Sequence, residues 1–390
     1  MSAIGVDQDM DENNRKTVIR NIGKKLIDDY CTDGIIRCGI NGPYDDEETR
    51  VRNLSHLLVI TAIEVGVYQK EEYRQLIDKM GKELLNLSES DGQYVLRKKQ
   101  SKDKCNGVIG HAWVMEGLCY YYSISHNEDV IAQLKKIVQL HDFNRKLKLW
   151  MIPGSDGKID YTLNHQLWYT AALVEANSIL HDSVVADNIN FFMQNLPQIF
   201  MVNRNGRVKH GIIKRDNHVD YAKQIFKHVV MSMNEVCGRP SMKYKEEGYH
   251  VFNLMALARI YAIKTDYSFF TTEKFQRALS YVNTAYFTEG LKNRKVELDV
   301  SLKNNIKNED ELRMNIYGYP YNVPGLELLY VNSVFKCFDT DTVVADCLDE
   351  QINLTMDDSG MLTKCCHDKN TINYRVYEYY RYLERVECGE

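Results

Sequence analysis

Aromatic, amide, imidazole and carboxyl side chains gather just before and at the start of five apolar segments of this chain. The five runs are 106–113, 160–169, 246–253, 317–327 and 370–375. Flat aromatic rings beside amides and carboxylates suit sugars, because the rings stack on apolar sugar faces and the polar groups form hydrogen bonds with hydroxyls. Each such residue could instead be a well-satisfied core residue. Because the set recurs at equivalent places, we expect one shared cleft.

A short phrase recurs six times and indicates the elements that position these side chains. A polar residue precedes a glycine, and an aliphatic or aromatic residue follows closely. The copies begin at Asp33, Asp91, Asp156, Asn205, Glu289 and Ser359. Each copy follows an amphipathic segment and precedes a more apolar one. The repeat predicts stacked helical hairpins, because one hairpin cannot bury its own apolar face. The phrases are predicted to form tight turns, with 204–207 the strongest hairpin signal.

Twelve helices are predicted, six outer and six inner. The outer ones carry a single apolar stripe and cover 14–30, 71–88, 129–140, 184–199, 272–286 and 342–352. The inner ones are apolar on nearly every face and cover 54–67, 111–124, 165–180, 250–263, 326–335 and 374–383. Helices of the second kind are enclosed by neighbours. The pattern therefore predicts an all-α ring of six hairpins with its cleft at one rim.

Domain organisation is predicted to be simple. The acidic residues 1–13 read as a disordered tail, and 14–390 as a single domain. Two connections, about 206–246 and 290–320, are long for a compact domain. Such loops are usually functional or contain an extra helix, for which 221–232 is the candidate.

The predicted ring resembles the (α/α)6 toroid shared by many carbohydrate-active enzymes. Two motifs within it resemble the Asn-His and Tyr-His motifs of alginate-lyase-like polysaccharide lyases. They are Asn164-His165, followed by Trp168 and Ala171, and Tyr249-His250, followed by Asn253 and Ala256. The resemblance implies a lyase or a C5-epimerase that acts on a uronate-containing oligo- or polysaccharide.

Both reactions begin by removing a weakly acidic proton next to the uronate carboxylate, which donors must neutralise. Asn164 and His165 are expected to supply those donors. Tyr249 is expected to carry a proton to the leaving oxygen, with His111 or His250 as the base. The residues expected to bind the substrate are Trp113, Trp168, Glu247, Tyr319, Glu327 and Arg375, the last as a carboxylate clamp. The sequence does not separate elimination from epimerisation.

An inverting glycoside hydrolase on the same ring is the main alternative. It needs an acid and a base carboxyl about 6.5–9.5 Å apart. Glu247 with Glu327 or Asp160 is the preferred pair. Other plausible carboxyls are Glu116, Asp156 and Glu246.

Three further readings remain. Cys365-Cys366-His367 could bind zinc with Cys105 or Cys237, as in the toroidal lanthionine cyclases, although adjacent cysteines do not form a recognised tetrahedral spacing. Isoprenoid cyclases also use helical toroids, but their aspartate-rich metal-diphosphate motif is missing from this sequence. A non-catalytic toroid that binds a glycan or a protein is the third reading.

Composition limits the partners. Lys and Arg number 49 against 54 Asp and Glu, for a net charge of −5, so we expect no nucleic acid and no anionic membrane. Ten cysteines without a Cys-x-x-Cys, in a chain without an export signal, predict reduced thiols and a cytoplasmic protein. We expect neither a metal nor a cofactor. The oligomeric state is not predicted.

Overall fold

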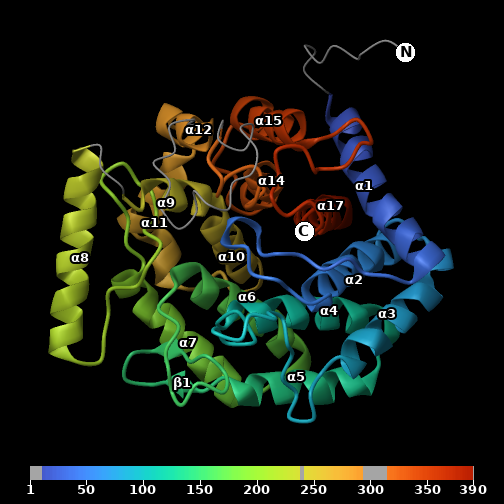
Figure 1. Cartoon of the computed structure of the whole chain (residues 1–390), viewed down its shortest axis with the longest axis horizontal. Helices are drawn as coiled ribbons and strands as arrows, with labels where there is room; N and C mark the ends of the chain where they lie inside the picture. The colour runs from blue at the N-terminus through green and yellow to red at the C-terminus, as the bar shows by residue number, and fades with distance from the viewer. Residues whose placement is uncertain (1–10, 238–240, 293–313, 390) are drawn as a thin grey trace.

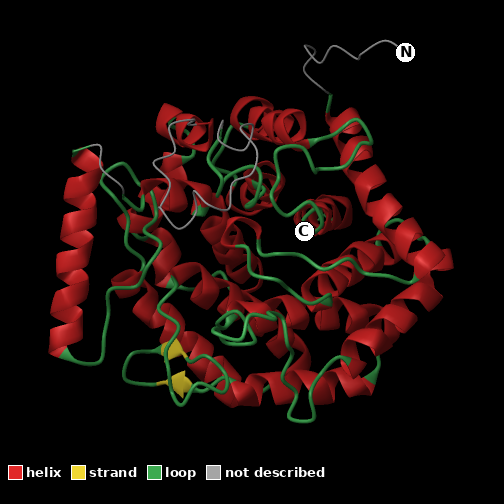
Figure 2. Cartoon of the chain, viewed as in Figure 1, coloured by secondary structure: helices red, strands yellow, loops and turns green. Residues whose placement is uncertain are grey.

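Twelve helices form a closed ring of six hairpins in the computed structural model, which describes residues 11–237, 241–292 and 314–389 (Figures 1 and 2). The outer members are α1 (Glu12–Asp33), α3 (Arg74–Asn86), α5 (Glu128–Leu140), α7 (Ser183–Ile199), α11 (Glu273–Tyr281) and α15 (Ala345–Thr355). The inner members are α2 (Val51–Gly66), α4 (Ile109–Ser125), α6 (Leu163–Leu180), α10 (His250–Ile263), α14 (Pro324–Phe335) and α17 (Tyr377–Cys388). Each inner helix contacts the next, and α17 returns to contact α2. The predicted (α/α)6 toroid is confirmed.

Shorter elements fill the connections. They are α8 (His218–Val236), α9 (Lys243–Gly248), α12 (Ala285–Lys292), α16 (Thr371–Tyr374), the 3-10 turns Gly42–Tyr44, Glu71–Tyr73 and Ser268–Thr271, the π-helical turn Thr340–Val344, and the antiparallel strands β1 (Phe143–Asn144) and β2 (Leu149–Trp150). The extra helix predicted in the long connection is confirmed as α8. The second long connection falls mostly outside the described residues. No helix of the described ranges is long and apolar enough to cross a membrane.

The glycine phrases form the turns between outer and inner helices. Gly206 has a φ of +97°, and Val202 and Val208 on either side of it form an antiparallel bridge. A side chain at Gly206 would place its Cβ 2.2 Å from the carbonyl oxygen of Arg277, so only glycine fits. Equivalent bridges join Ser88 to Tyr94, Met151 to Ile159, and Met356 to Leu362.

The fifth phrase, at Glu289, was predicted wrongly to be a turn. Gly290 lies inside α12. It lets α12 approach α9, because a Cβ at Gly290 would lie 2.6 Å from Cδ of Glu247. The glycine here serves close packing. At the other end of the chain α1 begins at Glu12, inside the predicted tail 1–13, of which 1–10 lie outside the described residues.

Side-chain caps are found at the start of four outer helices, but not at the start of the outer helices α3 and α15. Asp11, Asn127, Asp182 and Thr272 cap α1, α5, α7 and α11 with their side chains. Among the described residues, none of the six inner helices has a side-chain cap. The first backbone N–H groups of the inner helices therefore add positive potential to the rim where the helices start.

Candidate active site

A cavity of about 180 Å³ opens at this rim, and residues at or near the start of all six inner helices line it. Its lining residues are Asn41, Tyr44, Asp46, Arg52, Arg97, Lys102, Asn106, Ile109, Trp113, Thr162, Asn164, His165, His210, Lys245, Tyr249, Phe252, Tyr321, Asn322 and Arg375. Five predicted site residues, Trp113, Asn164, His165, Tyr249 and Arg375, are brought together here. The cavity therefore lies at the rim where the sequence repeat predicted a cleft.

His111 and His250 do not line the cavity, and their predicted place in the cleft is wrong. Both are fully buried. Nε2 of His111 accepts the backbone N–H of Tyr94, and Nδ1 of His250 accepts that of Val208. Tyr94 and Val208 are the last residues of their glycine phrases. The two histidines therefore tie a turn to its inner helix. Burial lowers the pKa of both, so they stay neutral.

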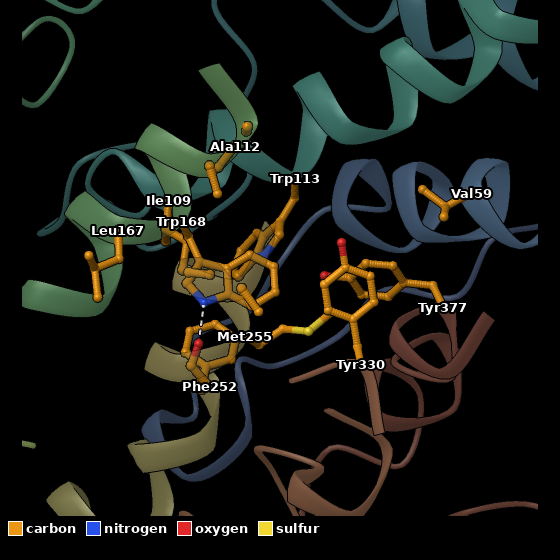
Figure 3. Close-up of a cluster of buried hydrophobic side chains, with 14 of the residues drawn as sticks. Val59, Ile109, Ala112, Trp113, Leu167, Trp168, Phe252, Met255, Tyr330 and Tyr377 are labelled. Atoms are coloured by element: carbon orange, nitrogen blue, oxygen red, sulfur yellow. Dashed lines mark hydrogen bonds between the residues drawn. The ribbon is translucent and has the colours of Figure 1, made fainter. Parts of the chain in front are cut away.

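Trp168 and Tyr319 also belong to the interior. The indole Nε1 of Trp168 donates to the carbonyl oxygen of Phe252, and the two rings stack inside the buried cluster (Figure 3). The hydroxyl of Tyr319 lies 3.6 Å from Sγ of Cys347. Trp168 packs between the inner helices α6 and α10, and Tyr319 packs against the outer helix α15, so neither side chain faces the cavity.

Glu247 and Glu327 are paired away from the cavity. Glu247 is buried beside Arg207 and Lys243, and Glu327 accepts from Arg375 at 2.6 Å. Asp156 is exposed in a turn, Glu246 pairs with Arg207 and Glu116 with Arg259. Among the residues that the structure describes, Asp46 is the one carboxylate that lines the cavity. The carboxyl pair of the predicted hydrolase is therefore not assembled.

Arg375 reaches the cavity but is committed elsewhere. Its guanidinium donates to Glu327, to Glu378 at 3.0 Å and to the carbonyl oxygen of Tyr321 at 3.0 Å. These contacts occupy Nε, Nη1 and Nη2 of the guanidinium. A free carboxylate clamp at Arg375 is not what the geometry provides.

His165 and Asp160 form a hydrogen-bonded dyad at the start of α6. Oδ2 of Asp160 lies 2.7 Å from Nδ1 of His165 and accepts the N–H of Val108 at 3.1 Å. Burial alone would raise the pKa of Asp160, but the charge and hydrogen bond of His165 and two backbone N–H groups lower it. Because the carboxylate only accepts, Nδ1 of His165 carries the proton and Nε2 is left as a proton acceptor.

Gly107 makes room for this dyad. A Cβ at Gly107, whose φ is +68°, would lie 2.1 Å from Oδ2 of Asp160 and 2.6 Å from Nδ1 of His165. The loop before α4 therefore needs glycine here. His165 itself keeps about 20% of its side chain exposed, toward the cavity it lines.

A second histidine, His210, was missed in the sequence. It lies in the loop after α7, held beside the start of α6 by the hydrogen bond from Leu163 N–H to its carbonyl oxygen at 3.1 Å. Burial, with Lys245 and His165 nearby, lowers the pKa of His210 far below its usual value. Its Nδ1 is buried without a partner among the described residues. The neutral imidazole of His210 can therefore form a hydrogen bond with a ligand at Nδ1.

Tyr44 and Tyr249 also line the cavity. The hydroxyl of Tyr249 lies 3.0 Å from that of Tyr44. Burial raises the pKa of both phenols well above 10, so both stay protonated at neutral pH and act as donors. The ammonium of Lys245 lies 4.8 Å from the ring centre of Tyr44.

The cavity is cationic in an acidic chain. Arg52, Arg97, Lys102, Lys245 and Arg375 line it against the single carboxylate of Asp46, which pairs with three cations.

Arg52 is only weakly paired with a carboxylate. It is buried and its guanidinium lies 3.9 Å from the ring centre of Trp113. Its carboxyl contact, to Glu48, is 3.4 Å long, and burial raises the pKa of Glu48 to about 7. The buried Oδ1 of Asn164 has no partner among the described residues. These groups suit a ligand that carries both an anion and hydroxyls.

One cluster has the composition of a metal site. Cys105, His111 and His141 lie buried with ligating atoms within 4.8 Å of one another. Nε2 of His111 accepts from Tyr94, Nδ1 of His111 lies 2.6 Å from Nε2 of His141, and Nδ1 of His141 lies 3.2 Å from the carbonyl oxygen of Met151.

This series of hydrogen bonds is complete when both imidazoles are neutral. A metal-bound histidine normally donates its second N–H, whereas His111 must accept there, so these residues do not fit a metal. No group of described residues brings Cys365 or His367 into a zinc site with Cys105 or Cys237.

No family model matches the chain. Archaeal glycosylation protein Q of Haloferax volcanii is 28% identical over 366 residues, which cover 89% of this chain and 91% of the relative.

Solved structures share the fold at low identity. A D-mannose isomerase aligns with a TM-score of 0.61 and 14% identity over 99% of this chain and all of its own. Cellobiose 2-epimerase from Bacillus thermoamylovorans has a TM-score of 0.56 and 12% identity, covering 93% and 99%. A polysaccharide lyase has a TM-score of 0.56 and 9% identity, covering 95% and 98%. These structures have the same toroid.

Proposed function

We propose that this chain is a sugar-active enzyme that removes and returns a proton at the carbon next to the carboxylate of a uronate, as an epimerase. The observation that carries the proposal is the His165–Asp160 dyad in a small cationic cavity. The dyad supplies a base of defined tautomer, and the cations supply a place for the carboxylate.

Charge placement supports the chemistry. The proton next to a carboxylate is weakly acidic, and its removal places a second negative charge on the carboxylate oxygens. Arg52 is buried beside Trp113 and has spare donor capacity, since its Nε has no partner among the described residues. We assign the sugar carboxylate to Arg52, and a sugar hydroxyl to Oδ1 of Asn164.

Proton transfer follows from the dyad. Nε2 of His165 takes the proton from carbon, and the C–H electron pair moves into the carboxylate to give an enediolate. Asp160 stabilises the imidazolium that forms. A water molecule on the other face returns a proton to the carbon and gives the epimer. The hydroxide that remains takes the proton from the His165 imidazolium, which restores the starting charges.

Elimination is the second candidate, and one observation favours it. Tyr249 keeps a protonated hydroxyl in the same cavity as His165. It could protonate the oxygen at C4 as that bond breaks, leaving an unsaturated sugar. We place epimerisation first because the cavity is small, whereas a polysaccharide lyase needs space for several sugar units.

The relative adds a context. Its name makes it a glycosylation protein, and an epimerase that adjusts a sugar during glycan assembly fits such a setting. Similarity to an isomerase and an epimerase supports the fold of the proposal alone.

The test is a panel of uronic acids and their glycosides, with the matching neutral sugars as controls. Products are separated to detect epimers, and absorbance is followed to detect unsaturated sugars. The proposal predicts epimer formation from a uronate and none from its neutral counterpart. An unsaturated product would establish the lyase instead. New reducing ends without either product would overturn both and revive hydrolysis.

A further inference from the structure

Helix α8 stands apart from the ring at its edge (Figure 1). None of its 19 residues is buried, although apolar side chains recur along it at helical spacing. Val229 is 51% exposed and Met233 62%. Its polar contacts with the body include hydrogen bonds from Arg207 to Glu235 at 2.6 Å and from Lys209 to Ser232 at 3.4 Å.

A long groove of about 1080 Å³ separates α8 from the body. One wall is a stripe of α8 that includes Ile225, Val229, Met233 and Val236. Met201 and Ile213 line the body side. An apolar helix stripe that faces its own protein across open space indicates a missing apolar occupant.

Four cations line this groove, namely Lys209, Lys214, Arg215 and Lys274, together with the carboxylate of Asp216, which pairs with Lys146. Their hydrogen bonds go to neutral oxygens, such as Oδ1 of Asn195 for Lys214 and the carbonyl of Pro197 for Lys274. In the described ranges, none of the four lies within salt-bridge distance of a carboxylate. The occupant should therefore carry negative charge as well as an apolar part.

The groove adjoins the proposed active site through a middle cavity. This cavity of about 300 Å³ shares Thr162 and His210 with the active-site cavity. It shares Lys209, Arg215 and Ser232 with the groove. The order from the ring outward is thus a sugar-sized cavity, a stretch with cations, and an apolar groove.

We propose that the substrate is a sugar linked through phosphate to a lipid chain. The sugar occupies the cavity at His165, the phosphate lies near Lys209 and Arg215, and the chain lies between α8 and the body. This inference rests on the proposed function for the position of the sugar.

Direct docking of α8 on an anionic membrane explains the arrangement less well. The helix carries Lys223 and Lys227 against Asp220 and Glu235, so it has no net positive charge, whereas membrane-surface helices are usually rich in Lys and Arg. The uncompensated cations line the groove and are not spread along the outer face of α8.

The experiment measures binding of decyl phosphate and of the shorter octyl phosphate to the full chain by calorimetry. Inorganic phosphate, which lacks the tail, and decyl glucoside, which lacks the charge, are the control probes. Val229→Asp places a charge in the groove. Phe226→Asp, at a position that is 70% exposed and outside the groove lining, is the matched control. Both changes are at exposed positions, so folding should be kept, which melting temperatures check.

We expect decyl phosphate to bind at least about tenfold more tightly than octyl phosphate, since each buried methylene contributes roughly fourfold. Val229→Asp should weaken binding at least about tenfold, and Phe226→Asp should not. The proposal would be overturned if inorganic phosphate or decyl glucoside bound as tightly as decyl phosphate. It would also be overturned if Val229→Asp left the affinity for decyl phosphate unchanged. Binding to anionic vesicles that only Phe226→Asp abolishes would overturn it too.

The two proposals fail separately. Turnover of a free uronate by a chain that does not bind decyl phosphate would leave the proposed function and remove the lipid. If decyl phosphate bound with the expected effects of both variants but no uronate were turned over, the lipid-binding groove would stand and the proposed function would fall.

Discussion

Asp160→Asn should remove catalysis by changing which nitrogen of His165 carries the proton. Oδ1 of Asp160 accepts the N–H of Thr162 at 3.0 Å, while Oδ2 accepts from Val108 at 3.1 Å and from His165 at 2.7 Å. All three partners are donors. An asparagine keeps the shape but replaces one of the two acceptor oxygens with an NH2 group.

Either orientation of the amide has a cost. With nitrogen at the Oδ2 position, it faces the N–H of Val108 and donates to Nδ1 of His165, which moves the imidazole proton to Nε2 and removes the base. With nitrogen at the Oδ1 position, it faces the N–H of Thr162. His165 then keeps its tautomer, but the imidazolium that forms loses its anionic partner. One buried backbone donor is unsatisfied in both cases, at about 1–3 kcal/mol of unfolding free energy. Turnover should fall by roughly 10² to 10⁴, the usual contribution of a positioned base.

The assay is turnover of the accepted uronate together with a melting curve for the same variant. Asp156→Asn is the control, because Asp156 is exposed in the same loop and has a φ of +51°, which asparagine tolerates. The control should change neither quantity. If Asp160→Asn keeps turnover within a few-fold of wild type while its stability falls, Asp160 has a structural role only and the dyad argument is wrong.

Three other changes test separate parts of the structure. Tyr249→Phe removes a protonated hydroxyl 3.0 Å from that of Tyr44 and should lower turnover by roughly 10² to 10⁴ if it transfers a proton, with about 1 kcal/mol lost from stability; unchanged turnover would assign it to packing. Arg375→Met leaves the carboxyls of Glu327 and Glu378 without their cation and should cost about 3–5 kcal/mol in denaturant unfolding; a small loss would revive Arg375 as a substrate clamp. Burial raises the pKa of Glu48 to about 7, so its contribution to stability is present below pH 4.5 and is lost as pH rises through 7, an effect of about 3 kcal/mol. Glu48→Gln should flatten that part of the stability curve, and an unchanged curve would contradict the shift.

The ring was predictable because its signals are local. Apolar stripes and all-round apolar segments report burial directly, and the glycine phrases mark turns through backbone geometry. The phrase at Gly290 failed because glycine also permits close helix packing, which only the tertiary neighbour Glu247 reveals.

The site was predictable in place but not in detail. His111 and His250 recur at inner-helix starts because the repeat itself needs an acceptor there for the phrase that precedes each helix. The same logic applies to Asn373, which accepts the N–H of Leu362 at 2.7 Å. Recurrence therefore pointed to the architecture, and the residues that differ between repeats point to the chemistry.

His210 gave no comparable signal. It sits in a loop, and it reaches the cavity only because Thr162 and Gly211 form an antiparallel bridge. The local sequence around Lys209, His210 and Gly211 has no motif that predicts this long-range pairing. The cations from separate loops, Arg97 and Lys102, were missed for the same reason.

Solvent deuterium exchange tests the central claim most directly. The chain is incubated with a uronate in heavy water, and magnetic resonance follows loss of the hydrogen on the carbon next to the carboxylate, which detects proton removal whatever the final product. The account predicts exchange with the wild-type chain, none with the matching neutral sugar, and a rate reduced roughly 10² to 10⁴ in His165→Gln. Exchange that persists unchanged in a folded His165→Gln variant would contradict the account.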